Sequence, residues 1–465
     1  MNLQELLTRP EGKTLEFKRD LSSLKPILKT LVAFANTAGG VLVIGRENDD
    51  TVVGVANVLL EEERLANAVA DGVRPGMTPE IDISTYEGKP LLIIRVPHWR
   101  GPFYIKAEGP QAGVYVRLGS TNRRAGPEIL AELQRSLSGL SFDQLPCSDL
   151  SAEDLDPVKI QHFFAASDRK VSQAHLETLG VLIPRAGRLV PSHGGLILFG
   201  RDTVRQRIFP DAAVSCARFR GTDKVHFLDR LASEGTVLDA LEEAPKFIRR
   251  NTRLAAKIET MRRRDIPEYP EVALREVLVN AVAHTDYSLT GMRIRVAIFA
   301  DRMEIENPGM LPFGMTLDDL KAGISRIRNR VITRVLRELG LFEEWGTGYR
   351  RVTEVCLAGG YPVPEWEEFG PALRVVFRPH PEVAATGGEG VNVPVNVPVN
   401  VPVNDRQWWF LDQLSQGRAV TAQDVAAQFG ITEKTARRDI AGLKAGNFIE
   451  FIGAPKKGFY RRKNR

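Results

Sequence analysis

A proline repeat near the C-terminus constrains this chain more than any other sequence feature. Residues 391–404 read VNVPVNVPVNVPVN, so a proline recurs at every fourth position. Proline has no backbone N–H donor, which excludes a helix and a central strand here. The preceding ATGGEG (385–390) is small and flexible. We therefore predict an extended linker over 385–404, with an edge strand for self-association as the alternative, because Val and Asn alternate.

The charge distribution separates the two sides of this linker. The chain has 465 residues and a net charge of +5. Residues 405–465 contain 12 basic and 6 acidic residues, or +6, so the remaining 404 residues carry −1. A local basic excess favours nucleic-acid binding by the C-terminal module. With 43% hydrophobic residues, the chain is neither wholly disordered nor fibrous, and its length suggests roughly three domains of ~150 residues.

The cysteines and the first residues favour a cytoplasmic protein. Cys147, Cys216 and Cys356 are odd in number and far apart, so we expect neither a disulfide framework nor a cysteine zinc site. The opening MNLQELLTRPEGK has no apolar signal core. The sequence contains no run of about 18 apolar residues, so we expect no membrane-spanning helix.

We predict an α+β multidomain protein with five consecutive parts. These are an α/β domain (1–135), an α/β connecting region (136–265), an α/β sandwich (266–384), the linker (385–404) and the C-terminal module (405–465). In the first part, the patterns predict strands over Thr14–Phe17, Val41–Ile44, Leu91–Val96 and Gly113–Arg117 and a helix over Ile27–Ala35. In the second, Ser192–Arg201 (SHGGLILFGR) reads as a strand entered through a Gly-Gly turn.

Two motifs near the N-terminus, EGKTLEFKRDL (11–21) and LVAFANTAGGVLVIGREND (31–49), resemble the Alba-like domain shared with Schlafen proteins. The resemblance covers roughly the first 135 residues and implies association with RNA or DNA. In cleaving members it also implies metal-dependent RNA hydrolysis by an acidic trio, here Glu11, Glu16 and Glu47. Carboxylate oxygens suit Mg²⁺, which polarises phosphate and activates water. Glu47 stands where the family commonly has Asp.

Basic residues in the same part suggest phosphate contacts. Lys18 follows the EFK glutamate, and Arg117, Arg123 and Arg124 lie in VYVRLGSTNRRAG (114–126). Guanidinium groups with small polar neighbours can bind phosphate. The alternatives are a solvated surface ion network formed by Glu11, Glu16 and Lys18, and a water-exposed basic turn over the arginines.

A third motif, EVALREVLVNAVAHTDY (271–287), predicts a helix with one apolar face. Glu276, Asn280 and His284 are four residues apart and share another face. A carboxylate and a carboxamide one turn apart can serve a water and a metal bound to a triphosphate. DRMEIENPGMLP (301–312), SRIRNR (325–330) and the glycine-rich EEWGTGYRR (343–351) follow in order.

This order resembles the GHKL-type ATP-binding fold of histidine kinases, gyrase-type topoisomerases, Hsp90 and MutL. More closely, it resembles the version in RecG-related transcriptional regulators. The resemblance implies ATP with Mg²⁺ or Mn²⁺, Glu276 as the water-activating acid and Asn280 as the metal ligand. It also places Asn307 and Gly309 at the adenine and Gly346 and Gly348 at the phosphates.

Two features of the sequence argue against rapid ATP hydrolysis and against a helicase motor. Asn307 stands where the superfamily usually has an adenine-reading Asp, so we expect nucleotide binding with slow or no hydrolysis. The sequence also lacks a G-x4-GK[ST] loop, so we expect no helicase motor. A weak ATPase and a metal-dependent endoribonuclease stay open, as does a retained fold without nucleotide.

Residues 405–465 predict a winged helix-turn-helix and resemble the DNA-binding ends of DeoR-like regulators. Trp408, Phe410, Leu411 and Leu414 suit a first helix, Thr421–Phe429 a second and Glu433–Ala445 a third. Short polar and basic side chains on the third helix suit the major groove of double-stranded DNA. We predict DNA contacts by Lys434, Thr435, Arg437 and Arg438 and, at the wing tip, by Lys456 and Lys457. A winged helix used for protein contacts is the alternative.

Together these features predict a homodimeric or larger DNA-binding regulator controlled by a bound nucleotide, with no membrane contact. A Schlafen-type nuclease, for example in phage defence, and a nucleotide-gated scaffold are the alternatives.

Overall fold

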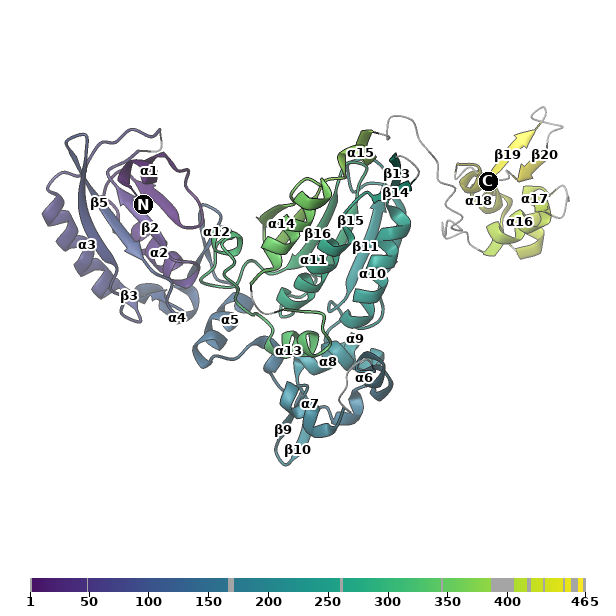
Figure 1. Cartoon of the computed structure of the whole chain (residues 1–465), viewed down its shortest axis with the longest axis horizontal. Coiled ribbons are helices and arrows are strands. Elements are labelled where there is room, and N and C mark those ends of the chain that lie inside the picture. The colour runs from purple at the N-terminus through teal and green to yellow at the C-terminus, as the bar shows by residue number, and fades with distance from the viewer. Residues whose placement is uncertain are drawn as a thin grey trace. The chain divides into compact units, whose positions relative to one another are not determined.

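The computed structural model describes residues 2–47, 49–165, 171–259, 262–343, 346–385, 405–415, 420–429, 431–445, 448–452 and 459–462. The chain divides into two compact units, Met1–Glu389 and Gly390–Arg465 (Figure 1). The proline repeat 391–404, with its two alternatives, and Lys456 and Lys457 lie outside the described residues. No helix in these ranges is both long and apolar enough to span a membrane.

The first unit begins with a four-stranded sheet in the order β1-β2-β5-β4. Strands β1 (Leu15–Lys18) and β2 (Gly40–Ile44) are parallel, and β2, β5 (Lys89–Val96) and β4 (Glu80–Tyr86) are antiparallel. Helix α2 (Leu24–Asn36) packs on this sheet because Ile27, Leu31 and Phe34 form one buried face. The strands and helix predicted here are confirmed, within a few residues at their ends.

Shorter elements complete this region. They are α1 (Leu3–Thr8), α3 (Val58–Gly72), β3 (Val73–Arg74), β6 (Tyr104–Ile105), α4 (Gly109–Ala112), β7 (Tyr115–Leu118), β8 (Thr121–Arg124) and α5 (Pro127–Ser138). Strands β7 and β8 form a hairpin, in which Val116 faces Arg123.

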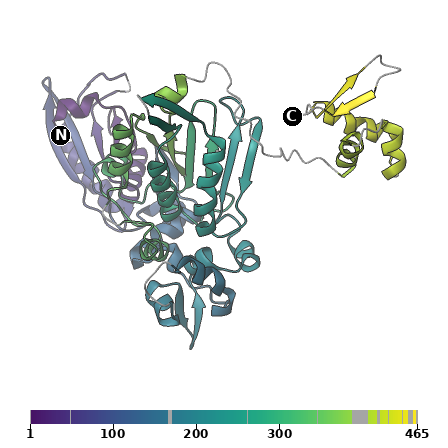
Figure 2. The same cartoon turned by 45° about the vertical axis from the view of Figure 1, so that its right-hand side comes forward.

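A six-stranded sheet follows, in the order β12-β11-β15-β16-β18-β17. The strands are β11 (Val214–Phe219), β12 (Phe227–Ala232), β15 (Ile294–Ile298), β16 (Met303–Pro308), β17 (Glu365–Phe369) and β18 (Ala372–Phe377). Strand β11 pairs in parallel with β15, so the region assigned to 136–265 supplies two strands to the sheet of the region assigned to 266–384. Helices α10 (Val237–Asn251), α11 (Glu271–His284) and α14 (Gly348–Gly359) run alongside the strands (Figure 2).

One prediction in the connecting region is wrong. Residues His193–Phe199 form helix α8, and not a strand. The Ser192 side chain caps this helix by accepting a hydrogen bond from the Gly195 backbone N–H at 2.9 Å. Every residue of α8 after His193 is buried, and a continuous apolar run does not distinguish a buried helix from a buried strand.

The remaining elements of the first unit are short. They are α6 (Pro157–Phe163), α7 (Gln173–Leu179), β9 (Leu182–Arg185), β10 (Arg188–Pro191), α9 (Asp202–Ile208), β13 (Leu254–Glu259), β14 (Arg262–Pro267), α12 (Leu317–Lys321), α13 (Arg330–Glu338) and α15 (Pro381–Ala385). Asp143 ties the connecting region to α13, because its carboxylate accepts hydrogen bonds from the backbone N–H groups of Val331 and Ile332 at 2.7 and 2.9 Å.

In its described residues, the second unit contains three helices and a two-stranded sheet. The elements are α16 (Asp405–Ser415), α17 (Ala422–Phe429), α18 (Glu433–Ala445), β19 (Ile449–Ile452) and β20 (Phe459–Arg462). Phe410, Val425, Ala436, Ile440 and Leu443 are buried together and form the core of this unit. Thr421 begins α17 as predicted, because its side chain and backbone both bond to Asp424.

Candidate nucleotide site and nucleic-acid interfaces

Helix α11 positions the polar residues of the predicted nucleotide site. Leu274, Val277, Leu278 and Val282 are buried and hold the helix against the sheet and its neighbours. The polar residues Glu276, Asn280 and His284 occupy another face, one turn apart. The sequence periodicity therefore predicted both the apolar buried face and the half-buried polar one.

All seven residues predicted for nucleotide binding line one cavity of about 80 Å³. They come from three distant segments of the chain. The segments are α11 with Glu276, Asn280 and His284, the end of β16 with Asn307 and Gly309, and the start of α14 with Gly346 and Gly348. The tertiary structure thus brings together residues that are separated by more than 70 positions in the sequence.

One end of the cavity is polar. The Asn280 side-chain amide donates to the Glu276 carboxylate at 3.1 Å, and Arg351 of α14 donates to the same carboxylate at 3.4 Å. Gly348 lies directly against this pair, because a Cβ there would be 2.9 Å from both Asn280 Nδ2 and Glu276 Oε1. Only glycine at 348 lets the backbone approach the pair this closely.

The other end of the cavity is mainly apolar. Asn307, at the end of β16, is 6% exposed, and its side-chain amide makes one long bond of 3.4 Å to the Pro308 carbonyl. Gly309 follows with φ of +100°. Most of the other side chains that line the cavity are apolar or aromatic, and Ser325, Arg326 and Glu343 also line it; the former are Val277, Ala281, Met310, Leu311, Pro312, Met315, Leu320, Ile324, Phe342, Tyr349, Trp366, Leu373 and Val375. A cavity with one polar and one apolar end suits a phosphorylated aromatic ligand.

His284 is held neutral at the edge of this cavity. Burial and, to a smaller extent, the nearby Arg328 guanidinium lower the pKa of its imidazole to about 4. The ring also contacts Phe342, with 6.2 Å between ring centroids. At neutral pH His284 can therefore donate or accept a hydrogen bond, but it adds no positive charge.

Several residues of the cavity were not predicted from the sequence. Arg351 lies three residues beyond Gly348 on α14 and contacts Glu276. Trp366 lies on β17, and its indole N–H is buried with no hydrogen-bond partner in the described chain. The Arg350–Arg351 pair directly after a glycine turn was a usable signal for the first. Nothing in the sequence near Trp366 marks the second.

Arg117 is corrected by the structure. Its side chain is fully buried, donates to the carbonyls of Gly12 and Leu15 at 3.0 and 3.2 Å, and forms an ion pair with Glu16. A guanidinium enclosed in this way cannot reach a phosphate. Arg117 therefore holds β1 to the β7–β8 hairpin, and the prediction that it binds nucleic acid is wrong.

The acidic trio is not gathered into a metal site. Glu16 is 6% exposed and pairs with Lys18 and Arg117, while Glu47 pairs with Arg19 at 3.1 Å. Glu11 accepts the Phe17 backbone N–H at 2.8 Å. Among the residues that the structure describes, no three His, Cys, Asp or Glu side chains are grouped to hold a metal ion.

Basic side chains nevertheless gather on one surface of this region. Arg123 and Arg124 are exposed on β8, and Arg124 shares Glu108 with Lys25 and Lys29 of α2. The sequence reading missed the two lysines, although their four-residue spacing on one helix was a usable signal. This basic cluster, Lys25, Lys29 and Arg124, suits a phosphate backbone better than the predicted loop with Arg117.

The predicted recognition residues lie on α18. Lys434, Arg437 and Arg438 are exposed, and Thr435 is half-buried. Arg437 pairs with Glu433 at 2.6 Å within the helix, an exposed contact that binding to DNA can replace.

Comparisons with known proteins match three separate parts of the chain. The family model described as "Schlafen, AlbA_2" matches residues 11–126. The model described as "Putative ATP-dependent DNA helicase recG C-terminal" matches residues 291–377, and that described as "DeoR-like helix-turn-helix domain" matches residues 406–450. No curated protein matches the chain.

Two solved structures are also similar. The N-terminal domain of the "Putative ATP-dependent DNA Helicase RecG-related Protein" from Nitrosomonas europaea is 30% identical; the match covers 27% of this chain and 90% of that domain, with a TM-score of 0.22. The chain belongs to the RecG-related proteins. The DIP2311 protein from Corynebacterium diphtheriae is 17% identical over 99% of this chain and 98% of its own, with a TM-score of 0.41.

The matched ranges divide the candidate residues of this RecG-related protein. Asn307, Gly309, Gly346 and Gly348 lie inside the RecG C-terminal match, whereas all of α11 precedes it. Helix α18 lies inside the DeoR-like match. The predicted Schlafen/AlbA-like, ATP-binding and helix-turn-helix domains are therefore confirmed, and the roles of single residues are not.

Proposed function

We propose that this RecG-related protein is a DNA-binding regulator whose activity depends on a nucleotide bound beside α11. The observation that carries the proposal is the convergence of three distant segments on one cavity with a polar and an apolar end. The basic face of α18 supplies the DNA contact, and the basic cluster of the N-terminal region supplies a second contact with RNA or DNA.

The residues present fit ATP with Mg²⁺ or Mn²⁺. Asn280 would hold the metal ion through its carbonyl oxygen, and Glu276 would orient a water. Bound metal would supply charge neutralisation for the phosphates. Gly346 and Gly348 expose backbone N–H groups without a Cβ, and the unpartnered Trp366 N–H can donate to an acceptor on the base or sugar.

The small size of the cavity favours regulation over rapid turnover. At about 80 Å³ it is smaller than the ~300–1,000 Å³ typical of ligand sites, so a nucleotide must widen it. Gly346 and Gly323 contact closely here, since a Cβ on Gly346 would lie 2.2 Å from the Gly323 carbonyl oxygen. Glu276 is also engaged by Arg351. Nucleotide binding therefore selects a different arrangement around α11, which is the requirement for a switch.

A titration of the full-length protein with fluorescent ATP and Mg²⁺ tests nucleotide binding. We expect saturation at micromolar to millimolar nucleotide, lost in Asn280→Ala. Absence of binding at millimolar ATP would refute this proposal and leave a retained fold without nucleotide.

Mobility shifts with random and genomic duplex fragments test the DNA contact. We expect Arg437→Ala with Arg438→Ala to weaken binding about 10- to 100-fold, because each lost contact costs ~1–3 kcal/mol. The matched control is Arg295→Ala with Arg334→Ala, which removes the same charge from the first unit. Equal binding by the two double variants would exclude α18 as the reader.

A further inference from the structure

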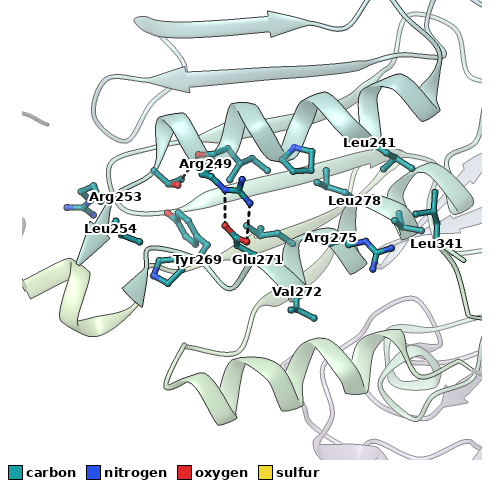
Figure 3. Close-up of a pocket in the computed structure, with 16 residues that line it drawn as sticks. Leu241, Arg249, Arg253, Leu254, Tyr269, Glu271, Val272, Arg275, Leu278 and Leu341 are labelled. Carbon is teal, nitrogen blue, oxygen red and sulfur yellow. Dashed lines mark hydrogen bonds and ion pairs between the residues drawn. The ribbon is translucent and has the colours of Figure 1, made fainter. Parts of the chain in front are cut away.

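A second and larger cavity lies between α10 and α11. Its volume is about 580 Å³, within the range typical of small-molecule sites. It shares no lining residue with the nucleotide cavity among the described residues. The lining comes from α10, from the segments before and after the β13–β14 hairpin, from the first turns of α11 and from Leu341 (Figure 3).

The walls of this cavity are mostly apolar. Ile248 of α10 and Leu274 and Leu278 of α11 are each at most 5% exposed and form its floor. Leu254 and Val272 stand at its mouth and are 57% and 59% exposed. A concave apolar surface of this size favours a ligand with an apolar body.

A buried hydroxyl group lines the same cavity. Tyr269 is 2% exposed, and its hydroxyl has no hydrogen-bond partner in the described chain. A buried polar group without a partner is unfavourable, so such groups are uncommon, and one that lines a cavity is a candidate ligand contact. The hydroxyl therefore indicates where a polar atom of the ligand would sit.

The charges around the cavity favour an anion. Arg249 is paired with Glu271 at 3.1 Å, and Arg253 is paired with the buried Glu268 at 2.6 Å. Arg275 is exposed and has no ion-pair partner within the described residues. It projects on the Leu341 side of the cavity, whereas Tyr269 lies on the Leu254 side (Figure 3).

We propose that this cavity binds an elongated apolar carboxylate, with the carboxylate at Arg275, the apolar body between α10 and α11, and a second polar atom at the Tyr269 hydroxyl. The observations behind it are independent of one another: volume, apolar walls, one unpartnered hydroxyl and one unpaired guanidinium. A ligand of this class satisfies the last two at once.

The ligand site adjoins the nucleotide site along two stretches of chain. On α11, Leu278 and Val279 line the larger cavity while Val277 and Asn280 line the smaller one. After α13, Leu341 lines the larger cavity and Phe342 the smaller one. Widening one cavity moves a wall of the other, so the apolar carboxylate changes the affinity for nucleotide. This coupling rests on the proposed nucleotide binding, whereas the ligand site itself does not.

Calorimetry of the full-length protein without nucleotide tests the site, with decanoate, decanol and decyltrimethylammonium as probes. We expect decanoate to bind about 10-fold more tightly than decanol, and the cation most weakly, because only the carboxylate makes a charge-assisted hydrogen bond with the Arg275 guanidinium. Arg275→Gln should remove the preference for decanoate over decanol. The matched control Arg295→Gln, an exposed arginine on β15, should retain it. Equal affinities for the anion and the cation would overturn the proposal.

Tyr269→Phe provides a second test, which distinguishes a ligand contact by the hydroxyl from a purely structural role. With 10-hydroxydecanoate as the probe, we expect the wild-type protein to prefer it over decanoate about 3-fold, and the variant to show no preference. Unfolding by urea should show no loss of stability, because the hydroxyl has no partner to lose. A preference that persists in Tyr269→Phe would refute the role of this hydroxyl.

The coupling is measured by repeating the ATP titration with saturating decanoate. A several-fold change in ATP affinity, matched by the same change in decanoate affinity with ATP present, supports it, since linkage is reciprocal. Decanoate binding with an unchanged ATP affinity would overturn the coupling. Decanoate binding in a protein that binds no ATP would instead refute the proposed function and leave the ligand site intact.

Discussion

The two cavities that share α11 differ in how they relate to the sequence. The smaller one, about 80 Å³, is lined by all seven residues that the sequence predicted for nucleotide binding. The larger one, about 580 Å³, is lined by none of the predicted site residues, although several of its lining residues lie on the same helix. A motif records side chains that a particular chemistry requires. The size of a cavity records how neighbouring elements pack, so the better-marked site need not be the larger one.

Each cavity nevertheless contains the same kind of feature. The Trp366 N–H in the smaller cavity and the Tyr269 hydroxyl in the larger one are buried without a hydrogen-bond partner in the described chain. In both cases the aromatic ring explains the burial and leaves the polar atom unexplained. Substitutions that affect one cavity and spare the other therefore test whether the two are separate sites.

We expect Gly348→Val to give the largest difference between the two cavities in ligand affinity. A Cβ at this position would lie 2.9 Å from both Asn280 and Glu276, so the side chain would occupy the polar end of the smaller cavity. We expect ATP affinity to fall at least about 100-fold, or ~2.7 kcal/mol, while decanoate still binds. The matched control is Gly76→Val, where nothing lies within 4 Å of the added Cβ. Loss of both ligands would indicate a general loss of structure.

Acidification should affect the smaller cavity first. Burial lowers the pKa of His284 from 6.5 to about 4, so the unfolded chain binds a proton there more readily than the folded protein. The stabilisation is complete above pH 6.5 and is lost as the pH falls toward 4, by at most about 3 kcal/mol. Urea unfolding at several pH values measures this dependence.

We expect His284→Gln to flatten the pH dependence between 6.5 and 4, and His162→Gln, an exposed histidine, to leave it unchanged. An identical slope in His284→Gln and the wild-type protein would show that His284 is not the titrating group. No histidine is among the described lining residues of the larger cavity, so decanoate affinity at a fixed charge of the ligand should change less.

A smaller effect is expected from Arg351→Gln. Arg351 contacts Glu276 at the polar end, where the phosphates of a nucleotide would lie. We expect ATP to bind about 10-fold more weakly and adenosine to be nearly unaffected, because only ATP carries the phosphates. Arg350→Gln is the control, since Arg350 is exposed and pairs with Glu354 at 2.7 Å. Equal losses for ATP and adenosine would contradict a phosphate contact.

The smallest effect is expected from Trp366→Phe. This substitution removes the indole N–H and keeps an aromatic ring beside Tyr349, whose ring centroid lies 5.7 Å away. We expect about a 3-fold loss of adenosine affinity, with little change in urea stability beyond that of the smaller ring. Decanoate affinity should not change. Tyr269→Phe should show the opposite pattern, with the ligand of the larger cavity weakened and adenosine unaffected.

The parts of this protein that the sequence predicted well depend on local periodicity. The apolar periodicity of α11 predicted that Glu276 and Asn280 share a different face of the helix. The apolar periodicity and capping residues of 405–445 predicted a helix-turn-helix. Both follow from 3.6 residues per turn and from capping chemistry, which act within a few residues.

The wrong predictions concern residues whose role or secondary structure depends on burial, which the local sequence pattern does not show. Arg117 and Arg123 read alike in the sequence, yet one is fully buried and the other is exposed on the same hairpin. The run 194–199 has no polar side chain, which fits a buried helix as well as a buried strand. Neither distinction is present in a window of neighbouring residues.

The sequence by itself determined the order of the domains, the periodic faces of α11 and α18, and the residue types of the nucleotide motif. Only the tertiary structure decided that three segments close on one cavity, that Arg117 is internal, and that α10 and α11 leave a second cavity with a buried hydroxyl. The physical reason is range. Backbone geometry and capping act between neighbours in the chain, whereas packing and desolvation depend on residues that are distant in sequence.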